Sequence, residues 1–377
     1  MKIGILTQPL HYNYGGIIQN WALQQVLKRC GYEPEMVFLV SGEKADVRLL
    51  ALRALSLIKC LAKKYVLKQE GIYLHSPFDP RYCPSVYYYA DSEFIKRINK
   101  TKPLGRNTDL AHLVNRRRYD AFIVGSDQVW REEYSPNIFS FFLDFLPKND
   151  KRRRIAYAAS FGKESDYISL EKMPQCRKLL TRFDAVSVRE NEGIEIINND
   201  FGRQQVEKVL DPTLLLSSVD YDNLISPDDH KTKPFIASYI LDNAEEKESI
   251  LKAVSSVKDL PISKMSIDIV PGSMASISQW LANFADADFV VTDSFHGCVF
   301  SIIFGKPFIA VANKERGLDR FTSLLGEFEL TNRLISNYHE FRDHKDILLS
   351  MPDYNTVNSR LETLRQSSLK FLTNALA

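Results

Sequence analysis

Short, unbroken apolar runs recur along this chain, and each is followed by a polar turn and a segment with helical periodicity. Lys2–Thr7 is the first such run, Gln8–Gly16 is a turn-rich loop, and Ile17–Cys30 has the spacing of a helix. Gly31 is placed to end that helix, and Glu35–Val40 is the next run. Strands that are apolar throughout are typical of parallel sheets covered on both faces. The pattern therefore predicts βαβ units and an α/β fold.

These units form two series. The first continues with expected strands at Ala121–Gly125, Ile155–Ala159, Ala185–Arg189 and Val206–Leu210. After the polar stretch Ser217–Lys233, the second series has expected strands at Phe235–Leu241, Ile262–Ile267, Phe289–Thr292 and Pro307–Ala312. Its expected helices are Ala244–Val257, Ile277–Ala285 and Gly297–Phe304, and a long helix is expected at Asn355–Ala377. We therefore expect a first domain over 1–216, a second over 217–350 and a C-terminal helix over 351–377, with an insertion at about 41–108 that does not follow the alternation. A length of 377 residues suits two such domains facing a cleft.

Composition excludes several classes of protein. The 49 Lys and Arg against 47 Asp and Glu leave a net charge of +2, too balanced for nucleic-acid binding driven by bulk charge. No apolar run reaches the ~18 residues that span a bilayer. The scattered cysteines argue against a disulfide framework and favour a reducing cytoplasm, and they are Cys30, Cys60, Cys83, Cys176 and Cys298.

The segment Asp288–Val311 carries the strongest chemical signal. An expected strand ends here in Asp293-Ser294-Phe295-His296, and a helix follows at Gly297. A helix start offers free N–H groups and a positive dipole end to phosphate or carboxylate, and it lowers the pKa of an adjacent imidazole. A histidine that only caps the helix is the alternative, but the combination of strand, polar turn, His-Gly and helix favours an acid or base role for His296.

Other polar residues also follow expected strands. Arg189 closes one and suits bidentate binding of phosphate or carboxylate, although a surface pair with Glu190 or Glu192 explains it equally well. The first loop brings Asn13, Tyr14, Gly15 and Gly16 to a helix start. In Ala121–Trp130, Asp127 and Gln128 are expected to bind hydroxyls and Trp130 to stack on a sugar, with capping and core packing as equal alternatives. No metal site is expected, because His339 and His344 are five residues apart and no H-E-x-x-H motif occurs.

At these segments the chain resembles the polysaccharide pyruvyl transferase family. The matching pieces include FIVGSDQVW, SVRENEG, LDPTLLL and TDSFHGCVFSIIFGKPF, and they run in order from the first strand to about Leu325. The resemblance implies a fold similar to GT-B glycosyltransferases, with two Rossmann-like halves and a C-terminal helix. It also implies transfer of a pyruvyl group from phosphoenolpyruvate, a co-substrate rather than a cofactor, onto sugar hydroxyls of a surface-polysaccharide precursor. By this resemblance His296 is the functional histidine and Arg189 a donor-binding arginine. The residues expected to bind the acceptor are Asn13, Tyr14, Gly15, Gly16, Asp127 and Gln128.

The chain departs from that family pattern at one position. Ser294 stands where better-studied members have a second donor-binding arginine. Ser294 and Gly297 are both expected on the donor side. Lys314, Arg316 or Arg320 replaces the missing charge, or the donor differs. Two alternatives therefore stay open, a GT-B-type glycosyltransferase that uses a nucleotide sugar and a non-catalytic anion- or sugar-binding module.

Within the insertion, Val47–Gln69 has six basic residues and no acidic one. Wound as a helix, it places Leu50, Ala54, Leu57, Ile58, Leu61 and Tyr65 on one face. That pattern is typical of a helix lying on an anionic membrane, and it would bring a cytoplasmic enzyme to a lipid-linked saccharide at the inner face of the membrane. The alternative is a helix packed on the first domain with its basic side in water.

Overall fold

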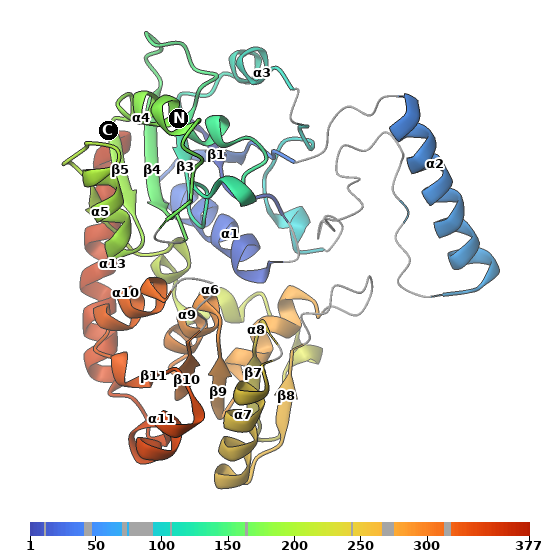
Figure 1. Ribbon diagram of the computed structural model, residues 1–377, viewed down its shortest axis with the longest axis vertical. Helices are drawn as coiled ribbons and strands as arrows, with labels where there is room; N and C mark the ends of the chain where they lie inside the picture. Colours follow the sequence, from blue (N-terminus) through green and yellow to red (C-terminus); the bar gives the residue numbers. More distant parts are fainter. Residues whose placement is uncertain are drawn as a thin grey trace.

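The computed structural model describes most of the chain as two stacked α/β domains (Figure 1). The described residues are 1–10, 13–40, 47–69, 74, 93–105, 108–162, 165–242, 244–265, 275–312 and 318–377, without the side chains of 47–50, 52 and 53. Each domain is built on a parallel sheet with helices on its faces, which confirms the predicted architecture.

The first domain contains a six-stranded sheet in the order β2-β1-β3-β4-β5-β6. Its strands are β1 Lys2–Leu6, β2 Glu33–Met36, β3 Ala121–Val124, β4 Arg153–Ala159, β5 Ala185–Val188 and β6 Glu207–Lys208. The helices of this part of the chain are α1 Tyr14–Arg29, α2 Val47–Leu61, α3 Leu110–Arg117, α4 Met173–Leu180 and α5 Asn191–Asn199. The central strands β3 and β1 are buried along almost their whole length, as continuous apolar runs require.

The second domain contains a five-stranded sheet in the order β11-β10-β9-β7-β8. Its strands are β7 Ile236–Tyr239, β8 Ile262–Lys264, β9 Phe289–Thr292, β10 Phe308–Val311 and β11 Leu334–Ile335. The helices from the interdomain connection onward are α6 Ser218–Asp222, α7 Glu245–Lys258, α8 Ile277–Ala285, α9 Phe295–Ile303, α10 Asp319–Glu327, α11 Tyr338–Asp343, α12 Lys345–Leu349 and α13 Tyr354–Leu376.

Most predicted elements are present with shifts of one to three residues, and two differences matter for the site. Helix α9 begins at Phe295, so His296 lies in its first turn rather than before it. Strand β6 is two residues long instead of five: Val209 N still donates to the carbonyl of Val188 in β5, but Leu210 N has turned to Ser368 Oγ of α13. The expected strand end at Ile267 lies outside the described residues.

Helix α13 joins the two domains rather than forming a unit of its own. At its start, the Tyr354 hydroxyl donates to the carbonyl of Lys306 in the second domain at 2.6 Å. At its end, Ser368 Oγ accepts a hydrogen bond from Leu210 N at 3.0 Å, and the Phe371 ring lies 6.3 Å from that of Tyr157 in the first domain. Figure 1 shows the helix running along the side of both domains. One apolar core therefore continues from the first domain into the second.

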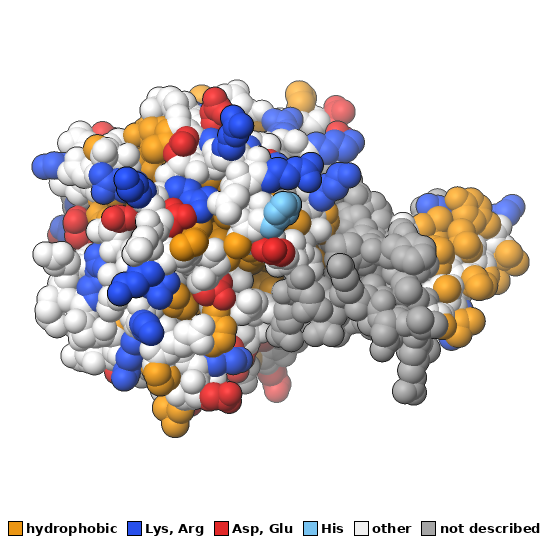
Figure 2. All heavy atoms as spheres, turned by 90° about the horizontal axis from the view of Figure 1, so that it is seen from above, with side chains coloured by type: hydrophobic (Ala, Val, Ile, Leu, Met, Phe, Trp, Pro, Cys, Tyr) orange, Lys and Arg blue, Asp and Glu red, His pale blue; other side chains and the backbone are white. Residues whose placement is uncertain are grey.

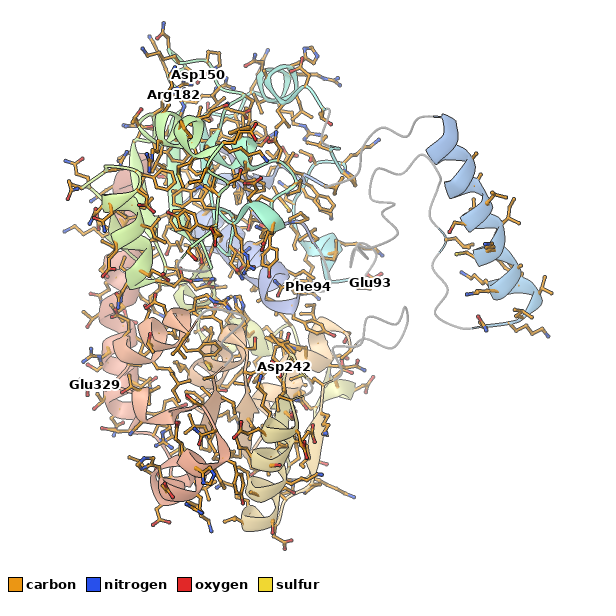
Figure 3. All side chains as sticks on the ribbon, in the orientation of Figure 1. Glu93, Phe94, Asp150, Arg182, Asp242 and Glu329 are labelled. Carbon is orange, nitrogen blue, oxygen red and sulfur yellow. The ribbon has the colours of Figure 1, made fainter. Side chains whose placement is uncertain are left out.

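The insertion divides into two parts with different surroundings. Its last part returns to the first domain, where Phe94 and Ile98 are buried and Lys100 forms a bridge beside Met36 at the end of β2 (Figure 3). Helix α2 stands away from the body (Figure 1). None of residues 54–69 is buried, so the alternative in which this helix packs on the first domain is not what the structure contains.

The strand orders place two crossover points opposite each other. In the first sheet the order in which strands are added changes direction between β1 and β3, and in the second sheet between β7 and β9. Ligands of open parallel sheets bind beyond the carboxyl ends of strands at such points. The segments that follow β1, β3 and β9 are therefore the first places to look for a functional site.

We predict that Leu372→Ala lowers the free energy of unfolding by about 2–5 kcal/mol, because it leaves a cavity where α13 crosses onto the first domain. Leu372 is completely buried in the shared core. Denaturant unfolding measures the effect, with Gln366→Ala on the exposed side of α13 as the control, expected within ~0.5 kcal/mol of the parent. Equal effects of the two changes would show that α13 does not connect the domains in solution.

Candidate active site

His296 lies at the junction of the two domains. It sits in the first turn of α9, directly after β9, and it is 7% exposed. Its Nε2 atom is 3.8 Å from Asp211 Oδ2 in the first domain. Nε2 is buried, and no described residue forms a hydrogen bond with it. The imidazole therefore keeps one nitrogen for a partner that is not part of the described chain.

The other side of the imidazole rests on the first turn of α1. A Cβ atom on Gly15 would lie 2.0 Å from His296 Nδ1, far inside van der Waals contact. Only glycine lets the backbone of the first domain come this close to a ring of the second. The predicted role of Gly15 in acceptor binding stays a prediction, while its role in the contact with His296 follows directly from the geometry.

Arg189 lies just beyond β5, where it is surrounded by carboxylates. Its Nε donates to Glu190 Oε1 at 2.8 Å and its Nη1 to Asp211 Oδ2 at 2.9 Å. Nη2 lies 3.6 Å from Asp127 Oδ1, and no described residue accepts a hydrogen bond from it. The Phe295 ring of the second domain covers the guanidinium at 4.3 Å. Arg189 is thus a buried interdomain cation rather than a surface partner of Glu190, and it retains one position for a new hydrogen bond instead of an open fork.

Asp211 connects Arg189 with His296. It is 1% exposed, and its Oδ2 accepts a hydrogen bond from Ser126 Oγ at 3.0 Å as well as from Arg189. Its Oδ1 accepts from the backbone and hydroxyl of Thr213 at 3.0 and 2.6 Å. Such a set of donors holds a carboxylate in one position and favours its charged form.

These charges determine the protonation of the site. Burial lowers the pKa of His296 below its ordinary value of 6.5, and the positive charges of Arg189 and Arg320 act in the same direction, whereas Asp211 and Asp127 oppose the change. Burial raises the pKa of Asp211, but His296, Arg189 and Thr213 outweigh it and leave that pKa lowered. Burial alone would lower the pKa of Arg189, but the carboxylates of Glu190, Asp211 and Asp127 outweigh burial and raise that pKa above its ordinary value. At neutral pH the site therefore contains a neutral imidazole beside the ionised Asp211 carboxylate and a fixed guanidinium.

The described residues that are expected to bind the donor lie at the same junction. Ser294 is the buried residue before α9, and its N–H donates to Thr292 Oγ1 at 3.1 Å. A Cβ on Gly297 would lie 2.1 Å from Thr292 Oγ1, so this glycine is needed for the helix to pack on β9. Arg320 of α10 is buried and lines a narrow interdomain pocket with Glu190 and Gly162. Lys314 and Arg316 lie outside the described residues.

The expected acceptor loop has structural contacts at its first two positions. Asn13 caps α1, accepting from Gly16 N at 3.1 Å, and its Nδ2 donates to Asp127 Oδ2 at 3.3 Å. Tyr14 is 2% exposed, donates its hydroxyl proton to the carbonyl of Ala275 at 2.7 Å and stacks on Trp280 with ring centroids 5.5 Å apart. Tyr14 therefore ties the domains together instead of facing a cleft.

The three residues of interest that follow β3 have different surroundings. Asp127 faces the junction, close to Asn13 and Arg189. Gln128 Oε1 accepts a hydrogen bond from Arg131 Nη1 at 3.2 Å, and the same amide lies against Gly162. Trp130 is fully buried, stacks on Phe142 and donates from Nε1 to the carbonyl of Phe141 at 3.1 Å. Of the alternatives predicted for Trp130, the structure has core packing rather than stacking on a sugar, because its ring is part of the first domain's core.

Two carboxylates of the site were not assigned a role from the sequence. Asp211 follows the expected strand Val206–Leu210 just as Arg189 follows its own strand, so its position at a carboxyl end was a usable signal. Glu190, which also accepts from Ser160 Oγ at 3.0 Å, was considered only as a surface partner. Asp293 is bound within the second domain, where it accepts hydrogen bonds from Leu241 N and Lys247 Nζ at 2.7 Å each; Lys247 also pairs with Asp242, at the end of this domain that faces the first (Figure 3).

Two Rossmann-like domains that meet at the carboxyl ends of their strands define a GT-B-type fold. The structure is similar to a Staphylococcus aureus MnaA–UDP co-structure (TM-score 0.50, 13% identity, covering 94% of this chain and 90% of that one). It is also similar to a Listeria monocytogenes structure described as a UDP-N-acetylglucosamine 2-epimerase (TM-score 0.52, 9% identity, covering 97% and 91%). At these identities the likeness establishes the fold alone.

The sequence itself establishes the family. A family model for polysaccharide pyruvyl transferase matches residues 13–315, which include Arg189, Asp211 and His296. The chain therefore belongs to the polysaccharide pyruvyl transferase family, a transferase family. A search of curated proteins finds no significant match.

We predict that Gly15→Ala destabilises the protein by about 1–3 kcal/mol, because the added methyl group must displace the His296 imidazole. Gly326→Ala is the matched control. Gly326 also lies in a helix, but its Cβ would meet nothing within 4 Å, so alanine there is expected to stabilise by about 1 kcal/mol. Denaturant unfolding of both variants tests the close approach, and a Gly15→Ala protein as stable as Gly326→Ala would contradict it.

We also predict a pH dependence of stability that comes from His296. Because the folded-state pKa of this imidazole is lowered, its contribution is fully present above about pH 6.5 and is lost as the pH falls through the folded-state pKa. Between pH 7 and 5 the parent should lose more stability than His296→Gln, whereas His339→Gln, at an exposed position, should follow the parent. Parallel curves for parent and His296→Gln would show that the imidazole is not held neutral by burial.

Proposed function

We propose that the protein transfers a pyruvyl group from phosphoenolpyruvate to hydroxyls of a bacterial surface-polysaccharide precursor, with formation of a ketal. The observation that carries this proposal is the buried His296, with one unbonded nitrogen, set among Asp211, Asp127 and Arg189 in a chain of this family. The acceptor would be a saccharide or a lipid-linked saccharide in the cytoplasm.

The chemistry balances without a redox cofactor. The methylene carbon of phosphoenolpyruvate gains a proton and becomes a methyl group, and the adjacent carbon becomes cationic. One sugar hydroxyl adds to that carbon and phosphate leaves with its bridging oxygen. A second hydroxyl then adds to the same carbon and completes the ketal. The hydroxyl protons must be removed and one proton must be supplied, so the reaction needs a group that exchanges protons near neutral pH.

His296 suits that role because its lowered pKa keeps the imidazole neutral and able to accept a proton. Once protonated, it would be stabilised by the Asp211 carboxylate at 3.8 Å. Asp127, which already accepts a hydrogen bond from Asn13, would orient an acceptor hydroxyl together with Gly16 and Gln128 on the first-domain side. These assignments use fixed groups whose positions do not depend on the substrate.

The donor's anionic groups need positive partners. Arg189 contributes Nη2, and Arg320 lies close enough to His296 to lower its pKa. We propose that these two cations, with Arg316, take the place of the family arginine that is Ser294 here, and that Gly297 and the start of α9 add backbone N–H groups. Since Asp127, Glu190 and Asp211 surround Arg189, the second cation is essential to the proposal.

Two other functions remain candidates. A nucleotide-sugar transferase is favoured by the fold, since the similar S. aureus structure is named as a UDP complex. A non-catalytic anion- or sugar-binding module is favoured by Ser294 in place of an arginine. Both predict a different ligand from phosphoenolpyruvate at the same junction.

We predict that His296→Asn lowers turnover by about 10²–10⁴-fold with little change in fold, because it removes the proton-exchanging group. The assay follows phosphate release from phosphoenolpyruvate in the presence of candidate saccharides. His339→Asn, at an exposed position, is the control and should keep the parental rate. Parental phosphate release by His296→Asn would refute the role of this residue.

A thermal-unfolding comparison with phosphoenolpyruvate, UDP, GDP and phosphate separates the two transferase functions. A ligand at 100 times its Kd adds about 2.7 kcal/mol of stability. Stabilisation by phosphoenolpyruvate beyond that given by phosphate supports the proposed donor, whereas stabilisation by UDP or GDP alone would favour the glycosyltransferase.

A further inference from the structure

Helix α2 and the turn that follows it expose apolar side chains to an unusual degree. Among residues 54–69, Leu55, Ile58, Tyr65, Val66 and Leu67 are 56–75% exposed. Figure 2 shows apolar side chains gathered on this helix, well separated from the body of the protein. Isolated apolar residues on a surface are common. A helical segment in which none of residues 54–69 is buried, however, needs a partner for its apolar side.

The same segment carries only positive charge. Lys59, Lys63, Lys64 and Lys68 are all exposed, and the sequence adds Arg48 and Arg53 without any acidic residue between 47 and 69. The protein as a whole has a net charge of +2, so this concentration is local. A partner must therefore offer an apolar layer together with negative charge.

We propose that α2 and the turn that follows it dock the protein on a bilayer that contains anionic lipid, lying in the headgroup region with the lysines of this segment directed to lipid phosphates. An anionic leaflet provides both required features, because acyl chains lie directly beneath its negative headgroups. A second copy of the chain fits less well, since pairing two α2 helices would bring like charges together.

The length of the helix supports lying on the membrane rather than crossing it. Its 15 residues extend about 22 Å, less than the ~30 Å of a hydrocarbon core. Among the described residues, no helix of the protein combines the length and the apolar character required to span a bilayer.

The attachment of α2 relates the membrane to the site. The inserted segment leaves the first domain after Val40, beyond the end of β2, and returns at Phe94, and both residues are buried in that domain. The strands of this sheet are parallel, so the point where the inserted segment leaves the domain lies at the same carboxyl end of the sheet as Gly15, Asp127 and Arg189. A docked α2 would hold that end of the sheet near lipid-linked saccharides. The docking itself does not rest on the proposed function.

Flotation of the full chain with vesicles tests the proposal. Vesicles of phosphatidylcholine are compared with vesicles that contain phosphatidylglycerol as well, at low and high salt. We expect binding only to the anionic vesicles at low salt, and its loss near 1 M salt, where the Debye length falls to about 3 Å. Absence of binding at low salt, or equal binding to both kinds of vesicle, would overturn the proposal.

Two sets of variants locate the contact. Changing Lys59, Lys63, Lys64 and Lys68 to Gln should lower the vesicle partition coefficient by about tenfold or more. The matched control changes Lys148, Lys151, Lys178 and Lys252, which are exposed on the body, to Gln and should retain most of the binding. The same loss in both quadruple variants would overturn the assignment to α2, because it would reflect net charge alone.

An apolar variant separates the membrane from a second copy. Ile58→Asp together with Tyr65→Asp should abolish flotation while leaving the parental monomer mass in light scattering, and both positions are exposed, so the body should remain folded. A parent that dimerises without lipid and is converted to monomer by these changes would instead identify a second copy as the occupant and overturn the proposal.

Discussion

Asp211 is a buried carboxylate on which groups from both domains depend. It accepts hydrogen bonds from Arg189, Ser126 and Thr213 of the first domain and lies 3.8 Å from His296 of the second. An ionised carboxylate in such a position is costly unless it is well paired, and here the pairing is supplied by a guanidinium whose own charge is stabilised by two more acids. The result is a rigid polar cluster in which the imidazole keeps a nitrogen available for a ligand.

The closeness of the domains follows from small residues as much as from charges. Gly15 lets the start of α1 touch the His296 ring, and Gly297 lets α9 pack on Thr292 so that His296 is directed toward the first domain. Tyr14 stacks on Trp280 beside this contact, and α13 spans both domains from Tyr354 to Phe371. These contacts position the groups of the interdomain site relative to one another, and the proposed reaction would depend on such prearranged charges.

Two helices outside the βαβ repeats have opposite surroundings. Helix α13 buries Leu361, Leu372 and Leu376 in the shared core, whereas α2 and the turn that follows it expose Ile58 and Tyr65 on a segment separated from the body. Both have an apolar face, so amphipathic spacing alone does not distinguish them. The difference in charge does, because the apolar face of α2 is accompanied by basic residues only.

The sequence by itself determined the α/β class, the two series of strands, the long terminal helix and the candidates His296 and Arg189, because continuous apolar runs and carboxyl-end polar residues are local patterns. It left Trp130 open between sugar stacking and core packing, and it missed Asp211 and Glu190 as partners of Arg189, because local spacing does not say which side chains from distant segments meet. Only the tertiary structure decided that Arg189 is enclosed by three carboxylates and that Gly15, by lacking a Cβ, lets the backbone of α1 contact the His296 ring. The physical reason is that burial, and with it the pKa of His296, depends on how two domains pack, which is a property of contacts between residues nearly three hundred positions apart.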